Sequence, residues 1–251
     1  MVSYNPFTLE GKSILITGAA GGIGRATAVE CAKLGANLIL TDINEDGLRT
    51  SLAELENSKL HRYVVANLTI DEEIDRLVGE IDKLDGFVSN AGVTKPALVK
   101  FINREDLERI MSINAMAPMF LTQRLLKKKK FVKGASIVFT VSIGGVYTTA
   151  IANAMYGSSK GALQVFMKNV ALESAVSGIR CNSVNPGMIN TGLLKPGTYS
   201  EEDRQRDMQT YPMKRYGEPR EVALGIVYLL SDASSFVTGH SLIIDGGKTL
   251  Y

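Results

Sequence analysis

The chain has few residues of the kinds that hold metals or form disulfides. Among its 251 residues are two cysteines, Cys31 and Cys181, and two histidines, His61 and His240. Because these four residues lie far apart and lack metal-ligand spacing, they predict neither a zinc site nor a disulfide framework. We therefore expect no metal, and we expect the chain to work in a reducing compartment, the cytoplasm.

Long hydrophobic runs and an excess of one charge are also missing. No stretch approaches about 18 continuous apolar residues, so the sequence predicts no membrane span. The first residues lack the basic region and apolar run of a signal peptide. Lys and Arg number 28 against 26 acidic residues, a net charge of +2, which gives no electrostatic case for nucleic acid.

What the chain does contain is a regular alternation of short apolar runs with helical patterns. Uninterrupted apolar strands joined by helices predict a parallel sheet that is covered on both faces. We expect strands at 13–17, 37–41, 61–66, 86–89, 136–141, 180–184 and 241–244. The expected helices are 22–34, 45–55, 71–84, 104–130, 155–175 and 219–230. The chain, 1–251, is thus predicted to be one doubly wound α/β domain.

One long segment, 187–217, interrupts this alternation. It contains Pro196, Gly197 and Pro212 and a polar helix-like stretch at 200–208, and it lies between a strand and a helix. Long insertions in compact domains often act as lids over a site. The alternative is a solvated excursion with no role in binding.

The first strand is followed by the glycine-rich sequence TGAAGGIG, Thr17 to Gly24. Glycines allow a tight turn, a close approach of backbone to a ligand, and close packing of helix on strand. A helix begins at this loop, so its free N–H groups and dipole favour a pyrophosphate. The position between strand and helix predicts a nucleotide site.

Asp42 ends the second strand, 18 residues after Gly24. A carboxylate there can accept hydrogen bonds from both hydroxyls of an adenosine ribose and would repel a 2′-phosphate, which favours NAD(H) over NADP(H). The alternative is that Asp42 caps the helix that starts near Glu45. Arg25 complicates the choice, because a guanidinium beside the loop could neutralise an extra phosphate.

Tyr156 and Lys160 lie four residues apart in a predicted helix and therefore share one of its faces. A phenol ionises near pH ~10, and a fixed cation nearby favours its phenolate. The pair is thus a candidate for proton transfer near neutral pH. Taken alone, such a pair is more often the ordinary polar edge of an amphipathic helix.

Several motifs now occur together in a fixed order, and the chain resembles the short-chain dehydrogenase/reductases over essentially its full length. The resemblance rests on TGAAGGIG, SNAG at 89–92, Asn114, Ser142, Tyr156-x-x-x-Lys160, NPGMINT at 185–191 and IIDGG at 243–247. It implies a Rossmann domain with seven parallel strands. It also implies hydride exchange between a nicotinamide cofactor and an alcohol or carbonyl carbon.

The resemblance assigns roles to four residues. Tyr156 would be the general acid/base. Lys160 would lower the pKa of this phenol and bind the nicotinamide ribose. Ser142 would hydrogen-bond the reacting oxygen, and Asn114 would hold a water that links Lys160 to solvent.

The resemblance also implies a cofactor site. Its expected residues are Gly18, Gly22, Ile23, Gly24, Asp42, Asn67, Leu68, Asn90, Ala91, Gly92, Tyr156, Lys160, Pro186, Gly187, Ile189 and Thr191. The sequence departs from the family at Asn67, where an aspartate is usual, and at Ser89, where asparagine is commoner. The loop that separates Ser142 from Tyr156 by fourteen residues is slightly long.

The expected substrate pocket is mostly apolar, which favours keto-acyl, steroid or other hydrophobic carbonyl compounds over small polyols. Its expected residues are Thr94, Ser142, Gly144, Tyr147, Asn153, Met188 and Leu193. The basic run Lys127 to Lys130 is either a solvated helix end or a dock for an acidic carrier protein, as in the related 3-oxoacyl-carrier reductases. Asp42 counts against the dock, because those relatives generally use NADPH.

The sequence thus predicts an NAD(H)-dependent oxidoreductase that interconverts a secondary alcohol and a ketone. The alternatives are a 3-oxoacyl-carrier-protein reductase that uses NADPH and a nucleotide-binding sensor without turnover. The resemblance further implies a homotetramer, with a dimer as the fallback. Helices 104–130 and 155–175 would pair with symmetry mates, the latter through Ala162, Phe166, Val170 and Ala171, and the apolar tail 241–251 would pack at a second two-fold contact.

Overall fold

The computed structural model describes residues 4–192 and 200–250, and its strands form one parallel sheet. The strand order is β3-β2-β1-β4-β5-β6-β7. The strands are β1 (Ser13–Thr17), β2 (Asn37–Asp42), β3 (Arg62–Val65), β4 (Leu84–Ser89), β5 (Phe131–Thr140), β6 (Arg180–Pro186) and β7 (Ser241–Ile244). All six pairings are parallel, which confirms the predicted doubly wound Rossmann fold.

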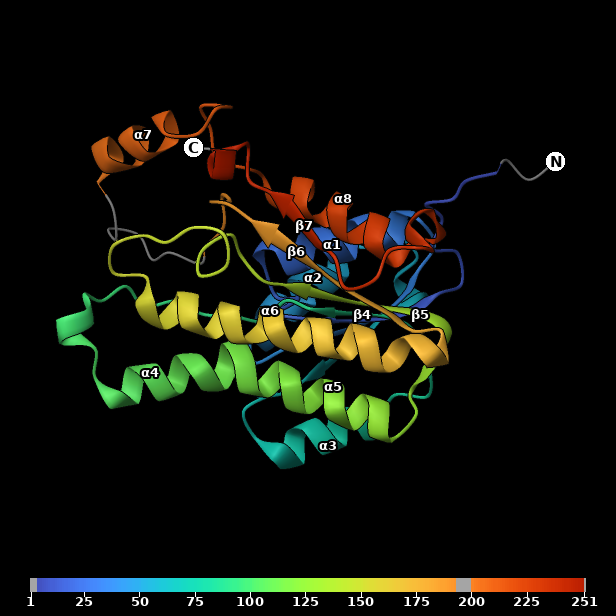
Figure 1. The fold of residues 1–251 in the computed structure, drawn as a ribbon. Coiled ribbons are helices and arrows are strands. Elements are labelled where there is room, and N and C mark those ends of the chain that lie inside the picture. Colours follow the sequence, from blue (N-terminus) through green and yellow to red (C-terminus); the bar gives the residue numbers. More distant parts are fainter. Residues whose placement is uncertain (1–3, 193–199, 251) are drawn as a thin grey trace.

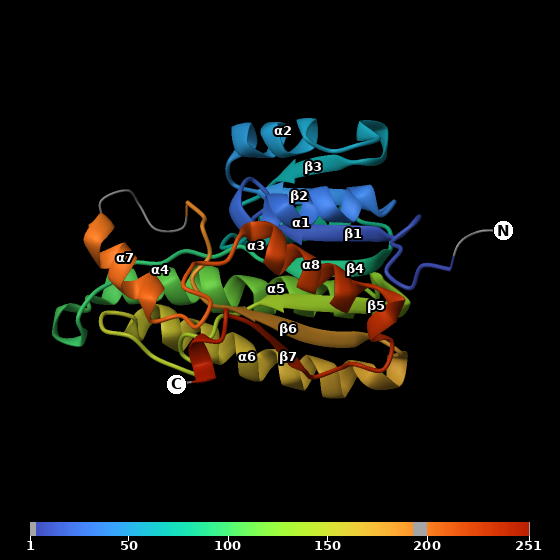
Figure 2. The ribbon, with the colours of Figure 1, turned by 90° about the horizontal axis from the view of Figure 1, so that it is seen from above.

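Helices cover both faces of the sheet (Figures 1 and 2). On one face lie α1 (Gly22–Lys33), α2 (Glu45–Ala53) and α8 (Pro219–Leu230). On the other lie α3 (Asp71–Gly79), α4 (Arg104–Met111), α5 (Ala117–Lys127) and α6 (Ala154–Ser174). The polar helix α7 (Glu201–Gln209) stands apart from both layers, at the edge where the strand arrowheads end (Figure 1).

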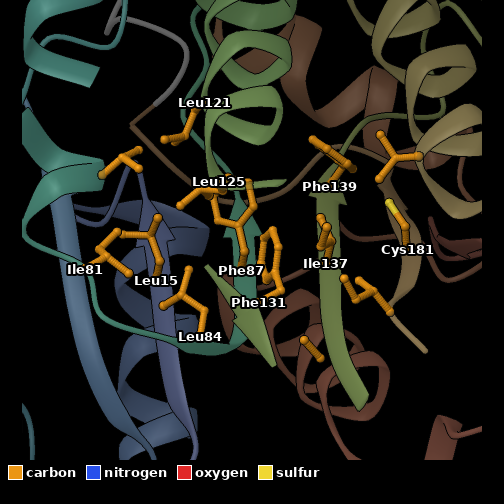
Figure 3. Close-up of a cluster of buried hydrophobic side chains, with 14 of the residues drawn as sticks. Leu15, Ile81, Leu84, Phe87, Leu121, Leu125, Phe131, Ile137, Phe139 and Cys181 are labelled. Atoms are coloured by element: carbon orange, nitrogen blue, oxygen red, sulfur yellow. The ribbon is translucent and has the colours of Figure 1, made fainter. Parts of the chain in front are cut away.

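Apolar side chains fill the space between the sheet and each helical layer. Figure 3 shows the layer under α5, where Leu121 and Leu125 pack toward Phe87 on β4. Phe87 and Phe139 meet edge to face with their ring centroids 6.4 Å apart. Burying one such large side chain stabilises the fold by about 1.5–3 kcal/mol, so these layers fix the strands and their ends.

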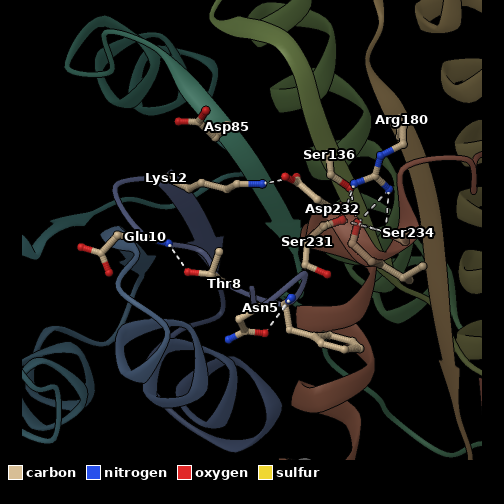
Figure 4. A network of polar contacts seen from close by, with 12 residues as sticks. Asn5, Thr8, Glu10, Lys12, Asp85, Ser136, Arg180, Ser231, Asp232 and Ser234 are labelled. Carbon is tan, nitrogen blue, oxygen red and sulfur yellow. Dashed lines mark hydrogen bonds and ion pairs between the residues drawn. The ribbon is translucent and has the colours of Figure 1, made fainter. Parts of the chain in front are cut away.

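The amino ends of the strands are closed by polar contacts (Figure 4). The Lys12 ammonium pairs with the Asp232 carboxylate at 2.7 Å. The Arg180 guanidinium donates to the carbonyls of Leu229 and Ser231 and to the Ser234 hydroxyl, at 2.9, 3.2 and 2.9 Å. The amino ends of the strands are therefore held together by an ion pair and hydrogen bonds within the chain.

The predicted boundaries differ most from the structure at three places. Helix α3 ends at Gly79, because Leu84 already belongs to β4 and pairs with Phe131. For the same reason β5 begins at Phe131, five residues earlier than expected. The long helix predicted at 104–130 consists of α4 and α5 joined by a π-helical turn, Ser112–Met116.

The expected subunit-facing residues of α6 were partly wrong. Val170 and Ala171 are 5% and 3% exposed and belong to the core of their own chain. Phe166 packs against Phe139, with ring centroids 6.0 Å apart. The outer face of α6 instead exposes Val165 and Leu172.

Cys31 and Cys181 are both buried and unpaired, and burial raises the pKa of each thiol. Over the residues that the structure describes, no helix is long and apolar enough to cross a membrane. In the same part of the chain, no three His, Cys, Asp or Glu side chains gather where they could hold a metal ion. The cytoplasmic location stays a prediction.

Candidate active site

The glycine loop between β1 and α1 packs tightly against the loop that follows β4. Gly18 has a φ of +64°, and a Cβ there would lie 2.8 Å from the Cα of Ala91. A Cβ on Gly24 would lie 2.1 Å from the Gly18 carbonyl oxygen. Only glycine fits at these two positions, because a Cβ at either would meet backbone of the same chain. The close approach of this backbone to a ligand stays a prediction.

Hydrogen bonds join the ends of β1 and β4. The Thr17 hydroxyl accepts the N–H groups of Asn90 and Ala91 at 3.0 and 3.1 Å, and the Asn90 amide donates to the Gly18 carbonyl at 3.2 Å. These two strands flank the point where the strand order reverses, and open α/β sheets bind ligands in the crevice at such a point. The predicted cofactor residues of both loops therefore lie together.

Asp42 is held at the carboxyl end of β2 beside the glycine loop. Its two carboxylate oxygens accept the N–H groups of Ala20 and Asn44, at 3.2 and 3.0 Å. The helix cap expected as the alternative role is made by Asn44, whose side chain accepts the Gly47 N–H. Asp42 thus contacts the glycine loop and does not cap α2.

Arg25, the cation nearest to this loop in sequence, is bound to other parts of the chain. Its guanidinium donates to the Ala20 carbonyl at 2.7 Å and to the Ser51 hydroxyl at 2.9 Å, and it pairs with Glu54 at 3.3 Å. These contacts join the loop to α2 and occupy the guanidinium.

Asn67, which replaces the usual aspartate, forms a turn after β3. Its side-chain oxygen accepts the N–H and hydroxyl of Thr69, at 3.1 and 2.7 Å, and its own N–H donates to Glu73. Leu68 packs against the core. The contact of this pair with the adenine stays a prediction.

The structure brings Ser142, Tyr156 and Lys160 together at the carboxyl end of β5. Lys160 is 3% exposed, and its ammonium donates to the Thr140 carbonyl at 2.8 Å. Its Nζ lies 5.7 Å from the centroid of the Tyr156 ring. Ser142 hydrogen-bonds the Tyr156 phenol, while the Ser142 Oγ accepts the Gly144 N–H at 3.0 Å.

Burial dominates the protonation of this group. It lowers the pKa of Lys160 to about 8 and raises the pKa of Tyr156, against the opposing effect of the Ser142 hydrogen bond. The expected lowering of the Tyr156 pKa by Lys160 is therefore not found in the protein alone. At neutral pH the phenol carries its proton.

Asn114 lies in the π-helical turn between α4 and α5 and is fully buried. Its side chain accepts the Val93 N–H at 2.8 Å and donates to the Val93 carbonyl at 2.9 Å and the Ser159 hydroxyl at 3.0 Å. A Cβ on Gly92 would lie 3.4 Å from the Asn114 oxygen and 3.5 Å from the Lys160 Nζ. Asn114 therefore fixes the loop after β4 beside Lys160; the water expected there stays a prediction.

The segment after β6 lies over the glycine loop. Thr191 is in van der Waals reach of Gly22, since a Cβ on Gly22 would lie 3.4 Å from the Thr191 methyl carbon. The Met188 N–H donates to the Tyr211 hydroxyl at 3.1 Å, and the Asn190 N–H to the Gly217 carbonyl at 2.9 Å. Pro186, Gly187 and Ile189 belong to the same stretch, and their contact with a cofactor stays a prediction.

Tyr211 was not expected from the sequence. It is 3% exposed, and its hydroxyl holds the backbone of the segment that includes Ile189 and Thr191. The only available signal was an aromatic residue directly before Pro212 in an otherwise polar stretch.

The expected substrate residues partly gather around Ser142. A Cβ on Gly144 would lie 2.9 Å from the Asn153 amide nitrogen and 3.5 Å from the Ser142 hydroxyl. Tyr147 is 45% exposed. Thr94 and Met188 are partly buried, and Leu193 lies outside the described residues.

The sequence model of the family described as enoyl-(acyl carrier protein) reductase matches residues 18–249. The chain belongs to the short-chain dehydrogenase/reductase family. It is therefore an oxidoreductase that acts on CH–OH groups with a nicotinamide cofactor.

The names of the proteins that this dehydrogenase/reductase resembles refer to different substrates. It is 36% identical to the 3-oxoacyl-[acyl-carrier-protein] reductase FabG of Thermotoga maritima, over 96% of this chain and 99% of that one. It is 34% identical to the glucose 1-dehydrogenase of Gluconobacter oxydans, over 96% and 93%. The crystal structure of levodione reductase matches with a TM-score of 0.89 and 29% identity, over 96% and 99%.

The buried ammonium of Lys160 predicts a pH-dependent difference in stability. Its pKa falls from 10.5 to about 8 on folding, so between these values the unfolded chain binds more protons and the unfolding free energy rises with pH. Lys160→Met removes this titration. From pH 8 to pH 10 the unfolding free energy of the natural protein should therefore rise by about 2 kcal/mol more than that of the variant.

Urea denaturation of both proteins at pH 8 and pH 10 measures this difference. Lys168→Met, which removes an exposed lysine from the same helix, is the control. Its unfolding free energy should depend on pH in the same way as that of the natural protein. An equal pH dependence for the Lys160 variant and the natural protein would show that Lys160 keeps its ordinary pKa.

Proposed function

We propose that the protein is an NAD(H)-dependent oxidoreductase that interconverts a secondary alcohol and a ketone by hydride transfer. The observation that carries the proposal is the convergence of Ser142, Tyr156 and the buried Lys160 at the carboxyl end of β5. A non-catalytic nucleotide sensor has no need of this arrangement, because burying a lysine beside a phenol costs stability.

Tyr156 gives its proton to the carbonyl oxygen in reduction and removes the hydroxyl proton in oxidation. The raised pKa supports the first role, since the phenol is protonated at neutral pH. Ser142 steadies the same oxygen. Because its Oγ already accepts the Gly144 N–H, its own hydrogen remains to be donated to a substrate oxygen or to a phenolate.

Lys160 keeps a positive charge beside Tyr156 at neutral pH, and this charge favours the phenolate that forms as the proton leaves. Asn114 holds the loop after β4 in place beside Lys160. We propose that a water in this region returns protons from solvent to Lys160.

The residues present fit a dinucleotide. A Cβ on Gly21, the residue directly before α1, would meet no atom within 4 Å, so the first turn of α1 is open to a pyrophosphate. Asp42 would hold the adenosine ribose, Lys160 the nicotinamide ribose, and Ile189 and Thr191 the carboxamide. When bound, the nicotinamide supplies or accepts the hydride.

Two contacts support NAD(H) over NADP(H). Asp42 lies beside the glycine loop as an acceptor, where a 2′-phosphate would be repelled. Arg25, which could have neutralised that phosphate, is bound by the Ala20 carbonyl, Ser51 and Glu54.

Exposed apolar side chains on the segments that follow β4 and β5 support a hydrophobic carbonyl substrate. Val99 and Phe101 are 74% and 66% exposed, and Ile151 is 86% exposed. The loops that carry them are joined by a hydrogen bond from the Ala97 N–H to the Ala152 carbonyl, at 3.0 Å. A substrate with an apolar tail would cover this surface.

The names of the relatives favour a second candidate, a 3-oxoacyl-carrier-protein reductase that uses NADPH. Within this chain the basic run offers it limited support. Lys128 lies 3.8 Å from Asp75, and the Lys130 ammonium donates to the Ile81 carbonyl. The run is thus partly occupied, which favours a helix end over a dock for an acidic carrier.

We propose a homotetramer. The outer face of α6 exposes Val165 and Leu172, and the 3₁₀ turn that follows it exposes Val176. On the other face of the sheet α8 exposes Leu224, and Phe236 is exposed in the loop that leads to β7. Two separate apolar surfaces on opposite sides of the sheet are suited to two different two-fold contacts. Leu242 and Ile244 of the expected tail pack partly on the core of their own chain.

Replacing Tyr156 with Phe should lower turnover at least about 100-fold, because general acid/base catalysis contributes roughly 10²–10⁴-fold. The affinity for the cofactor should stay nearly unchanged. Turnover is measured with a panel of ketones and secondary alcohols and both cofactors. Tyr228→Phe on α8 is the matched control, and a Tyr156→Phe rate above a tenth of the natural rate would rule out the assignment.

NAD(H) should give a higher kcat/KM than NADP(H), and Asp42→Ala should narrow the ratio by about tenfold or more, since a hydrogen bond to a charged group is worth about 1.5–3 kcal/mol. Asp46→Ala, an exposed carboxylate on α2, should leave the ratio unchanged. A natural preference for NADPH would contradict the proposal and favour the carrier-linked alternative.

Light scattering at micromolar concentration should give about 109 kDa, four times the 27.2 kDa of the chain. Val165→Asp places a charge on the exposed face of α6 and should shift the mass to a smaller assembly. A mass of about 27 kDa for the natural protein would exclude both the tetramer and the dimer.

A further inference from the structure

A buried cluster of amide and hydroxyl side chains lies one turn of α6 beyond Lys160. Gln164 of α6 is 5% exposed, and Ser183 and Asn185 of β6 are fully buried. Strands β6 and β7 are neighbours, and α6 packs on β6 (Figure 1). Buried amides destabilise a fold unless they are hydrogen-bonded, so the partners of this cluster decide what it does.

The hydrogen bonds of the cluster lead to Ser142. The Asn185 side-chain nitrogen donates to the Ser142 carbonyl at 3.0 Å and to the Gln164 side-chain oxygen at 3.2 Å. The Asn185 oxygen accepts the Ser183 hydroxyl at 2.8 Å. Because a carbonyl can only accept, the Asn185 nitrogen must face Ser142, and both of its hydrogens are used.

Ser142 lies between two residues that continue the ladder between β5 and β6. The β5–β6 ladder continues past β5, since Val141 and Ile143 donate to the carbonyls of Val184 and Pro186, at 2.9 and 3.0 Å. The N–H that Pro186 lacks would have faced the Val141 carbonyl, and the Ser142 carbonyl accepts the Asn185 side chain instead of a backbone N–H of β6. The Asn185 amide supplies a donor from β6 to this stretch of chain.

Gln164 links Asn185, which binds the Ser142 carbonyl, to the helix that carries Tyr156 and Lys160. Tyr156, Lys160 and Gln164 recur every four residues and so lie on one face of α6. The Gln164 oxygen binds Asn185, and its nitrogen donates to the Ser241 hydroxyl of β7. One hydrogen bond, Gln164 to Asn185, therefore joins α6 to the residue that holds Ser142.

We propose that Asn185 and Gln164 are positioning residues that set the place of Ser142 relative to Tyr156. The proposal rests on the catalytic role proposed for Ser142 and Tyr156. Asn185 holds the Ser142 backbone, the Gly144 N–H holds its Oγ, and Gln164 ties both to α6. Without the amide pair, Ser142 is free to move away from the phenol.

Two nearly isosteric variants test this role, Asn185→Leu and Gln164→Met. Each should lower kcat about 10- to 100-fold, the effect of a displacement on the order of 1 Å in a catalytic group, and leave the Kd for NADH within about twofold. Gln164→Glu keeps the oxygen that accepts from Asn185 and should recover part of the loss. The assay uses the panel compound that the natural protein turns over fastest.

Asn169→Ala is the matched control. Asn169 is an exposed amide on α6 whose side chain donates to the Val165 carbonyl of the same helix, at 3.0 Å. This variant should keep the natural kcat and the natural Kd for NADH.

A readout without turnover separates this inference from the proposed function. Proteins labelled with ¹³C at tyrosine Cζ give a Tyr156 signal that disappears in Tyr156→Phe, and its titration reports the phenol. Since the Ser142 hydrogen bond lowers the pKa of Tyr156, both positioning variants should move this titration to higher pH. Asn169→Ala should not move it.

If the natural protein turns over no compound of the panel, the proposed function fails while the Tyr156 titration still decides the inference. If Asn185→Leu and Gln164→Met lower the melting temperature but keep both the natural kcat and the natural Tyr156 titration, the amide pair only stabilises the fold and the inference is wrong.

Discussion

A parallel sheet covered on both faces keeps its ladder hydrogen bonds away from water, so polar groups must gather where the strands end. The amino ends are closed by the contacts of Arg180 and Lys12. At the carboxyl ends, Thr17 joins the glycine loop to Asn90, and the Thr140 carbonyl binds Lys160. Polar contacts at the amino ends of the strands therefore stabilise the fold, whereas the groups that can bind and react lie at the carboxyl ends.

At the carboxyl ends of the strands, burial shifts the pKa values of two neighbouring groups in opposite directions. It weakens the hold of Lys160 on its proton and strengthens that of Tyr156. The two pKa values therefore move apart, to about 8 for Lys160 and upward from 10.0 for Tyr156, so that at neutral pH a charged ammonium lies beside a protonated phenol. The same dryness makes the Asn185 amide effective, because a hydrogen bond is stronger in an interior of low dielectric.

The sequence was sufficient wherever a local pattern sets the structure. Apolar runs located the strands, and the four-residue spacing placed Tyr156 and Lys160 on one helix face. It failed where distant contacts decide. Helix α3 stops early because Leu84 pairs with Phe131, and Arg25 is bound by residues of α2. The π-helical turn that holds Asn114 adds a single residue per turn, too small a change for apolar periodicity to reveal.

Helix α7 differs from the sheet because polar contacts, not buried apolar side chains, hold it to the rest of the protein. None of its residues is buried, and its contacts with the body of the protein include Arg204 to Asn190 at 2.9 Å and Asp207 to Tyr216 at 2.8 Å. Exposed polar contacts can be exchanged for water at little cost, so this helix belongs to the part of the fold that opens most easily. Asn190 lies between Ile189 and Thr191, two residues expected in the cofactor site. Any movement of α7 therefore acts on the same segment that Tyr211 holds in place.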